Sequence, residues 1–153
     1  YSIMSNNIQL RKASPSDAAA IHGLIVELAI FEKEPDAVKT SVEDYATGLE
    51  EKRFDAILAV DTDDHILGMA FFYTTFSTWS GKALYLEDFI VREEYRGKGI
   101  GKLLFEAYLE EAKNCGAKLA KWQVLDWNEL GKSFYRKYNT EVHLGWENWL
   151  IRM

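Results

Sequence analysis

The segment that most restricts the fold of this chain is a glycine-rich junction between an apolar extended run and an amphipathic helical pattern. Residues 82–92 predict a strand that is apolar on both faces, and residues 99–114 carry apolar side chains at helical spacing. Between them, glycines stand at positions 97, 99 and 101. Glycines let backbone N–H groups point into one concavity, and the helix start adds partial positive charge. The junction therefore predicts a central strand, a following helix and an anion site between them.

The charges around this junction favour a phosphate as the anion. Arg96, Lys98 and Lys102 flank or separate the glycines. The spacing excludes a P-loop, which needs Gly where Arg96 stands and Ser or Thr where Leu103 stands. It also excludes a dinucleotide fingerprint starting at Gly97, which needs a small residue in place of Lys102. The alternative is a glycine-rich turn that only ends a strand.

The rest of the chain alternates between strand-like and helix-like segments. Ser14-Pro15-Ser16-Asp17 predicts a helix start, with Ser14 as N-cap and Asp17 closing a capping box. We expect strands over 8–11, 56–60, 65–73, 119–125 and 146–153, and helices from 14 to about 34, over 41–50 and over 128–138. This mixture predicts an α/β (α+β) fold with helices packed on one sheet.

Composition narrows the classes of function. The chain has 18 Lys and Arg against 24 Asp and Glu, a net charge of −6, which argues against a nucleic-acid binder. It has no apolar run near the roughly 18 residues of a membrane span. We expect no membrane association and a cytoplasmic protein, with residues 1–3 as a cloning remnant and Met4 as the native start.

Cysteine and histidine give no sign of a disulfide or a metal site. Cys115 is the one cysteine, so an internal disulfide is excluded. His22, His65 and His143 are scattered without metal-ligand spacing, so we expect no metal.

Arg96-Gly-Lys-Gly-Ile-Gly101 resembles the pyrophosphate-binding loop of the GNAT superfamily, the acetyl-CoA-dependent N-acetyltransferases, whose pattern is Arg/Gln-x-x-Gly-x-Gly/Ala. The resemblance extends to the diamine (spermidine/spermine) acetyltransferase branch through the segments 24–32, 79–90, 95–101, 126–129 and 133–135. It implies one N-acetyltransferase domain over residues 4–153. Its fold would be a mixed, mainly antiparallel sheet with helices on both faces and a splayed parallel strand pair.

The same resemblance implies where acetyl-CoA binds. The backbone of the strand before the loop would hold the pantetheine arm and thioester, and the loop would hold the pyrophosphate. The residues implied are Phe89, Ile90, Val91, Arg96, Gly97, Lys98, Gly99, Ile100, Gly101, Lys102 and Asn128. Asn128 also stands where it would cap the short helix that follows.

Two side chains are implied in the chemistry. Tyr135 matches the family's catalytic tyrosine and would protonate the departing thiolate as general acid; the alternative is a tyrosine packed beside Phe134. Glu87 is the candidate base for the amine, directly or through water. Glu87 and Asp88 are adjacent and would face opposite sides of a regular strand, so a β-bulge there would re-aim one of them. The alternative is an edge position or an ion pair with Arg92.

The resemblance also implies a subsite for a cationic amine. Its residues would be Phe31, Glu32, Trp79, Glu87, Asp88 and Trp122. The alternative for Glu32 is a solvated surface charge, and for Trp79 and Trp122 it is core or surface packing. Departures from the family at Leu130, 138–139 and 121–123 leave the amine open among diamines, polyamines, lysine, thialysine and unrelated amines.

The resulting hypothesis is direct acetyl transfer from acetyl-CoA to a small primary amine within a ternary complex. An enzyme that acetylates protein lysines or N-termini is one alternative, and an acyl-CoA-binding sensor without turnover is another. Relatives in this family are commonly homodimers, and the aromatic segment 146–153 is a plausible interface.

Overall fold

The computed structural model describes residues 7–153, so the expectation for residues 1–3 and Met4 lies outside the described residues. The chain divides into two compact units, one that ends at Gln123 and one that spans Val124–Met153. Among residues 7–153, none of the helices has the length and apolar character that a membrane span requires.

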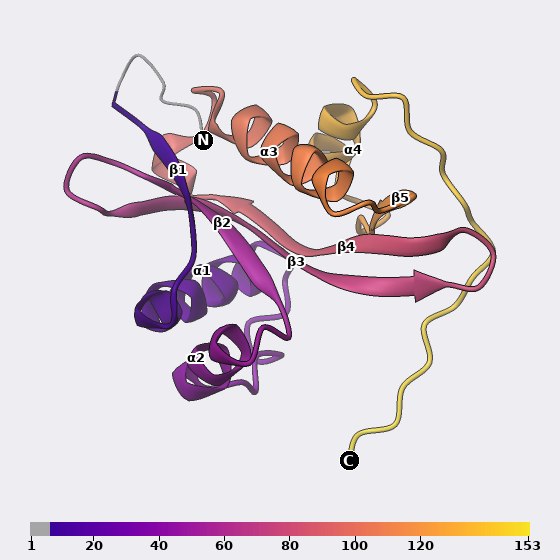
Figure 1. Cartoon of the computed structure of the whole chain (residues 1–153), viewed down its shortest axis with the longest axis horizontal. Helices are drawn as coiled ribbons and strands as arrows, with labels where there is room; N and C mark the ends of the chain where they lie inside the picture. The colour runs from indigo at the N-terminus through magenta and orange to yellow at the C-terminus, as the bar shows by residue number, and fades with distance from the viewer. Residues whose placement is uncertain (1–6) are drawn as a thin grey trace. The chain divides into compact units, whose positions relative to one another are not determined.

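The first unit is a five-stranded sheet with helices on both faces. The strand order is β1-β2-β3-β4-β5; the first three neighbouring pairs are antiparallel and the β4–β5 pair is parallel. Helices α1 and α2 cover one face and α3 covers the other (Figure 1). The strands are β1 (Gln9–Lys12), β2 (Asp55–Val60), β3 (Ile66–Ser77), β4 (Gly81–Val91) and β5 (Leu119–Trp122); the helices are α1 (Ala18–Phe31), α2 (Val42–Glu50) and α3 (Ile100–Asn114). This architecture confirms the predicted fold class.

The start of α1 follows from the capping signal. A 3₁₀ turn over Pro15–Asp17 precedes the helix, and the N–H of Ser14 donates to the Asp17 carboxylate at 2.8 Å. The Arg11 guanidinium donates to both Asp17 oxygens, at 2.8 and 2.9 Å. These hydrogen bonds, with Arg11 contributing most, hold the pKa of Asp17 below its ordinary value. The helix is thereby fixed to β1 by a buried carboxylate.

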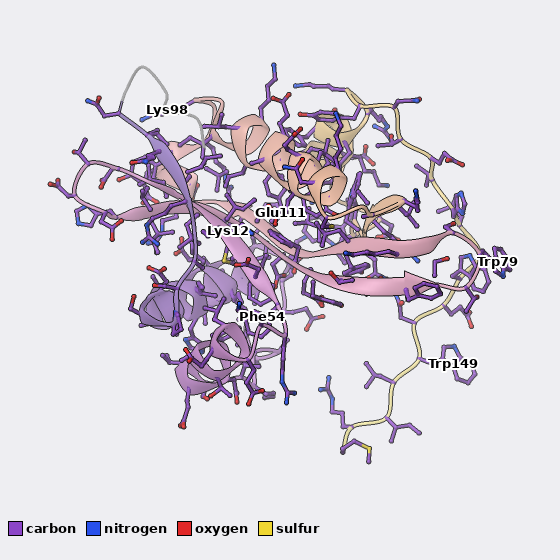
Figure 2. All side chains as sticks on the ribbon, in the orientation of Figure 1. Lys12, Phe54, Trp79, Lys98, Glu111 and Trp149 are labelled. Atoms are coloured by element: carbon purple, nitrogen blue, oxygen red, sulfur yellow. The ribbon has the colours of Figure 1, made fainter. Side chains whose placement is uncertain are left out.

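The core has two parts, one on each face of the sheet. On the α1/α2 face, the buried side chains include Ile21, Leu24, Tyr45, Leu58, Met69, Phe71 and Ile90. On the other face, Leu104, Phe105 and Tyr108 of α3 are fully buried. At the sheet edge, Lys12 of β1 forms ion pairs with Asp55 of β2 and Glu111 of α3, at 2.9 and 2.8 Å (Figure 2).

Strands β3 and β4 form a hairpin that extends past β2. The last pair between β2 and β3 joins Asp55 to Phe72, whereas β3 continues with β4 as far as Ser77. Trp79 lies at the tip of this hairpin and is 90% exposed (Figure 2). The hairpin therefore runs four residues longer on β3 than the predicted strand 65–73.

A β-bulge interrupts β4 at Glu87. Phe71 of β3 pairs with Asp88, and the next residue, Phe72, pairs with Leu86, so Glu87 has no opposite residue in the register. A bulge of this kind adds one residue to one strand and shifts its alternation. Tyr85 and Asp88, three residues apart, consequently lie on the same face of the sheet, the α1/α2 face to which Phe71 contributes.

The second unit contains one helix, α4 (Glu129–Tyr135), shorter than the predicted 128–138. The predicted strand at 146–153 is wrong: of residues 136–153, all of which the structure describes, none lies in a helix or strand. Trp146 and Trp149 are 79% and 87% exposed. Alternation of aromatic and polar residues suits a strand, but a strand also needs a partner for its backbone, and the described residues of this unit contain no strand to supply one.

Candidate active site

The parallel strands β4 and β5 separate before β4 ends. Their register runs from Ala83 opposite Leu119 to Leu86 opposite Trp122, after which β4 continues to Val91. This is the splayed pair that the resemblance implies. Phe89, Ile90 and Val91, the backbone expected to hold pantetheine, lie in the stretch of β4 beyond the last β5 pair.

The glycine-rich loop after β4 has the geometry of an anion site. Gly97 and Gly99 adopt positive φ angles of 77° and 82°, which side-chain-bearing residues rarely adopt. Gly99 is the N-cap of α3, and Ile100 anchors the helix start in the core at 1% exposure. The first N–H groups of a helix lack partners within the helix. The exposed charges of Lys98 and Lys102 add to this positive end, so the loop is suited to a pyrophosphate.

Arg96 connects this loop to the end of α1. Its Nε donates to the Val91 carbonyl oxygen at 2.9 Å, and its guanidinium carbon lies 5.3 Å from the centre of the Phe31 ring. Phe31 is the last residue of α1, and Glu32 is its C-cap. The structure thus brings a residue expected at the amine subsite into contact with one expected at the cofactor loop.

The carboxylates of Glu32, Glu87 and Asp88 form one acidic cluster on the α1/α2 face. Burial, followed by the charges of Glu87 and Glu32, raises the pKa of Asp88 to about 7. Burial also raises the pKa of Glu32. Glu87 is exposed, whereas Asp88 is half-buried. The expected β-bulge is present at this position, and the charges of Glu87 and Glu32 both act on Asp88.

Two tyrosines that the sequence did not indicate complete this cluster. Tyr73 and Tyr85 are opposite each other on β3 and β4, with ring centres 5.5 Å apart. Burial, followed by the charges of Glu87 and Asp88, raises the pKa of Tyr73. Burial, with Glu87 as the largest charge, raises the pKa of Tyr85 to about 12. Both phenols are therefore protonated donors at neutral pH beside the carboxylates.

Arg92, the alternative partner considered for these carboxylates, forms an ion pair with Glu27 of α1 at 3.3 Å. The positive charge of Arg92, which directly follows β4, is therefore already matched by a helix carboxylate. A cationic substrate would meet the cluster with its negative charge largely available.

The two tryptophans expected at the amine subsite have different environments. Trp122 packs edge-on against Phe105 of α3, with ring centres 5.1 Å apart, on the face opposite to Asp88. This is the packing role considered as its alternative. Trp79 is exposed at the hairpin tip, in the same hairpin as Tyr73 and Tyr85.

In the second unit, Asn128 and Tyr135 stand at the two ends of α4. The Asn128 Oδ1 accepts a hydrogen bond from the Gly131 N–H at 3.0 Å, which confirms the predicted cap. Tyr135 is half-buried, and its ring lies edge-on to Phe134 with centres 5.5 Å apart.

A small group of possible metal ligands, Asp61, Asp63 and His65, lies at the β2–β3 turn. Asp61 accepts hydrogen bonds from the N–H groups of Asp63 and His65, both at 2.9 Å, and pairs with the His65 ring. These contacts close the turn and account for the grouping of the three side chains.

The chain is similar in sequence to known acetyltransferases. The family described as "Acetyltransferase (GNAT) family" matches residues 16–139. A thialysine N-epsilon-acetyltransferase of Mus musculus is 34% identical, over 93% of this chain and 89% of that protein. A spermidine/spermine N(1)-acetyltransferase-like protein 1 of Homo sapiens is 30% identical over 83% of this chain and 19% of that protein.

Among solved structures, an aminoglycoside acetyltransferase from an uncultured soil metagenomic sample, in complex with trehalose, superimposes with a TM-score of 0.82. It is 18% identical, and the match covers 97% of this chain and 99% of that chain. At this identity the likeness concerns the fold.

Proposed function

Because the chain belongs to the acetyltransferase (GNAT) family, it is an N-acetyltransferase with acetyl-CoA as acetyl donor, and we propose that its acceptor is a small primary amine carrying a second positive charge. The observation that carries this proposal is the acidic cluster of Glu32, Glu87 and Asp88 next to the protonated phenols of Tyr73 and Tyr85. A lysine-type compound such as thialysine, or a diamine or polyamine, presents the charges that this cluster would attract.

The acetyl-CoA site in this proposal has two parts. The loop from Arg96 to Lys102 holds the pyrophosphate through its N–H groups and cations, which the positive φ angles of Gly97 and Gly99 support. The open stretch of β4 at Phe89, Ile90 and Val91 binds the pantetheine arm and offers an N–H to the oxyanion. Asn128 contributes a further contact while it caps α4.

The proposed amine site begins at the end of α1, next to Arg96. Phe31 lies against the Arg96 guanidinium, and Glu32 follows it at the helix end. Glu32 and the bulged pair Glu87 and Asp88 bind the ammonium groups. Trp79 at the hairpin tip can cover a methylene chain or a cation, whereas the packing of Trp122 on Phe105 favours a supporting role.

The reaction is direct transfer. The acidic cluster accepts a proton from the substrate ammonium, since free alkylamines are mostly charged at neutral pH. The neutral nitrogen attacks the acetyl carbonyl carbon, a C–N bond forms and the C–S bond breaks. Tyr135 protonates the departing thiolate as general acid.

Residues 4–153 act as one acetyltransferase domain, which is supported by a family match that runs across the boundary at Gln123. The homodimer and the cytoplasmic location expected from the sequence remain predictions. The exposed apolar side chains of 142–153 are consistent with an interface.

A thiol-release assay with acetyl-CoA tests this function. We expect turnover with thialysine, lysine, ornithine or diamines, and little with uncharged amines of similar length. Release of CoA only with lysine-containing peptides or protein N-termini would indicate a protein acetyltransferase. Binding of acetyl-CoA by calorimetry without thiol release for any amine would indicate a sensor.

A further inference from the structure

We propose that Phe31, the last residue of α1, is a positioning residue for the cofactor loop, because its ring holds the Arg96 guanidinium in the orientation that receives the pyrophosphate of acetyl-CoA. The inference rests on the proposed acetyl-CoA site and gives Phe31 a part in it that is separate from the amine subsite. It starts from two contacts between one face of α1 and the turn that leads from β4 into the glycine loop, each of them made by an arginine.

The two arginines are four residues apart, and so are their partners on α1. Arg92 forms an ion pair with Glu27 at 3.3 Å, and the Arg96 guanidinium carbon lies 5.3 Å from the centre of the Phe31 ring. Residues four apart on a helix lie on the same face, so Glu27 and Phe31 together present one face of α1 to this turn. The 3₁₀ turn over Glu93–Tyr95 separates the two arginines. The base of the loop is therefore attached to α1 at two points.

The end of α1 is closed by hydrogen bonds that span Phe31. The Lys33 N–H donates to the Ile30 carbonyl oxygen at 3.1 Å, and the Glu34 N–H donates to the Ala29 carbonyl oxygen at 2.8 Å. This is the pattern of a Schellman closure, and Lys33 adopts the left-handed conformation it requires, with a φ of 64°. The Phe31 ring is therefore presented to Arg96 from a defined backbone.

The Arg96 side chain is held in a way that leaves its terminal nitrogens for a ligand. Its Nε donates to the Val91 carbonyl oxygen at 2.9 Å, while Phe31 lies against the guanidinium. A guanidinium is planar and stacks on aromatic rings, and its fork of N–H groups matches the oxygens of a phosphate. Among residues 7–153, no group accepts a hydrogen bond from Nη1 or Nη2 of Arg96. These donors are therefore available to the pyrophosphate.

The ring contributes to cofactor binding by reducing the cost of ordering the arginine. Arg96 is exposed, and an unsupported arginine at a surface occupies many rotamers that it must give up when it binds a phosphate. The contacts with Val91 and Phe31 restrict these rotamers before the ligand arrives. Loss of the ring alone should therefore weaken CoA binding by about three- to fivefold, which is the contribution of a cation–π contact at an exposed site.

Calorimetric titration of the protein with CoA, in the absence of any amine, tests this role, because a part played by Phe31 in the amine subsite contributes nothing to that measurement. Phe31→Leu should raise the Kd for CoA by about three- to fivefold, and Phe31→Tyr, which keeps an aromatic ring, should restore it to within about 1.5-fold of the wild-type value. Ile30→Leu is the matched control: Ile30 precedes Phe31 on α1, is 59% exposed, and should leave the Kd unchanged. Thermal unfolding of each variant separates a loss of folding from a loss of affinity.

A double-variant cycle separates positioning of Arg96 from a general effect on the fold. Arg96→Met removes the charge and the N–H donors and should raise the Kd for CoA by about tenfold or more. On that background, Phe31→Leu should have no further effect, because the ring then has no guanidinium to hold. An unchanged Kd in Phe31→Leu, or a loss that adds in full to that of Arg96→Met, would overturn the inference.

Failure of the proposed function gives different results. If Arg96→Met binds CoA as well as the wild-type protein does, the pyrophosphate lies outside the proposed loop, and the cofactor site fails together with this role of Phe31. If Arg96→Met weakens CoA binding but Phe31→Leu does not, the cofactor site stands and only the role of Phe31 is rejected. If both variants weaken CoA binding as expected but no amine gives thiol release, the proposed acceptor fails and the role of Phe31 stands.

Discussion

The hydroxyl of Tyr108 on α3 donates a hydrogen bond to the main-chain carbonyl oxygen of Leu84 on β4, at 2.6 Å, from a fully buried side chain. Replacement by Phe leaves that carbonyl without this donor in the core. We expect Tyr108→Phe to lower the free energy of unfolding by about 1–3 kcal/mol. Urea unfolding followed by tryptophan fluorescence measures this change in the free energy of unfolding. The control is Tyr95→Phe in the half-exposed turn before α3, with a change within about 0.5 kcal/mol. Equal effects of the two variants would contradict the importance of the buried contact.

The glycine loop and the end of α3 offer a matched pair of variants. Gly97 and Gly116 both have φ of 77°, and an added Cβ would meet no heavy atom within 4 Å at either position. Each change to Ala should cost about 1–2 kcal/mol of stability through backbone strain alone. Calorimetry should show that Gly97→Ala weakens CoA binding by about tenfold or more, which is the contribution of one charge-assisted hydrogen bond. Gly116→Ala should bind CoA with the affinity of the wild-type protein. A similar loss in both would place the pyrophosphate elsewhere.

Tyr135→Phe tests the general acid. Removal of the phenol should lower kcat by about ten- to a thousand-fold, because the thiolate then leaves without a proton donor. The Kd for acetyl-CoA should change little, since the proposed role concerns the leaving thiolate. Pre-steady-state thiol release and calorimetry report the two quantities. Unchanged turnover would remove Tyr135 from catalysis and favour its packing on Phe134.

The Arg11–Asp17 pair predicts a specific dependence of stability on acid. Because the pKa of folded Asp17 is depressed below its ordinary 3.8, its contribution is present above that pH and is lost as the pH falls through the folded-state pKa. Asp17→Asn should cost about 1–3 kcal/mol at neutral pH and progressively less below pH 4 or so.

Asp64 is the control for this pair, since it binds the same Arg11 guanidinium but is 68% exposed. Asp64→Asn should cost less than about 1 kcal/mol at neutral pH. Thermal unfolding of both variants between pH 2.5 and 7 gives the comparison. A difference between Asp17→Asn and wild type that does not shrink in acid would contradict the linkage.

The local signals of the sequence predicted much of this structure. The capping residues Ser14 and Asp17, the loop glycines and the cap at Asn128 depend on neighbours within a few positions, and all are found as expected. The bulge at Glu87 could be anticipated because two adjacent carboxylates in an apolar strand need a common polar side.

What the sequence did not indicate depends on pairing between distant segments. Tyr73 meets Tyr85 only because β3 continues through the polar residues up to Ser77, which sets the register of the hairpin. The predicted strand ended at Tyr73, so this pair could not be placed. The segment 146–153 shows the same dependence: alternation is present, but a strand forms only where a second strand meets its backbone.

The extra residue Glu87 also divides β4 into two stretches whose alternation of side chains between the two faces is offset by one residue. Before Glu87, the side chains at odd positions, such as Tyr85, lie on the α1/α2 face of the sheet. After Glu87, the side chains at even positions, such as Asp88, lie on that face. Removal of Glu87 alone would leave every neighbouring pair in place, because Leu86 and Asp88 already lie on opposite faces and would then alternate as in a regular strand. Removal of any other single residue of β4 would instead shift one stretch by a position and move its side chains to the opposite face of the sheet.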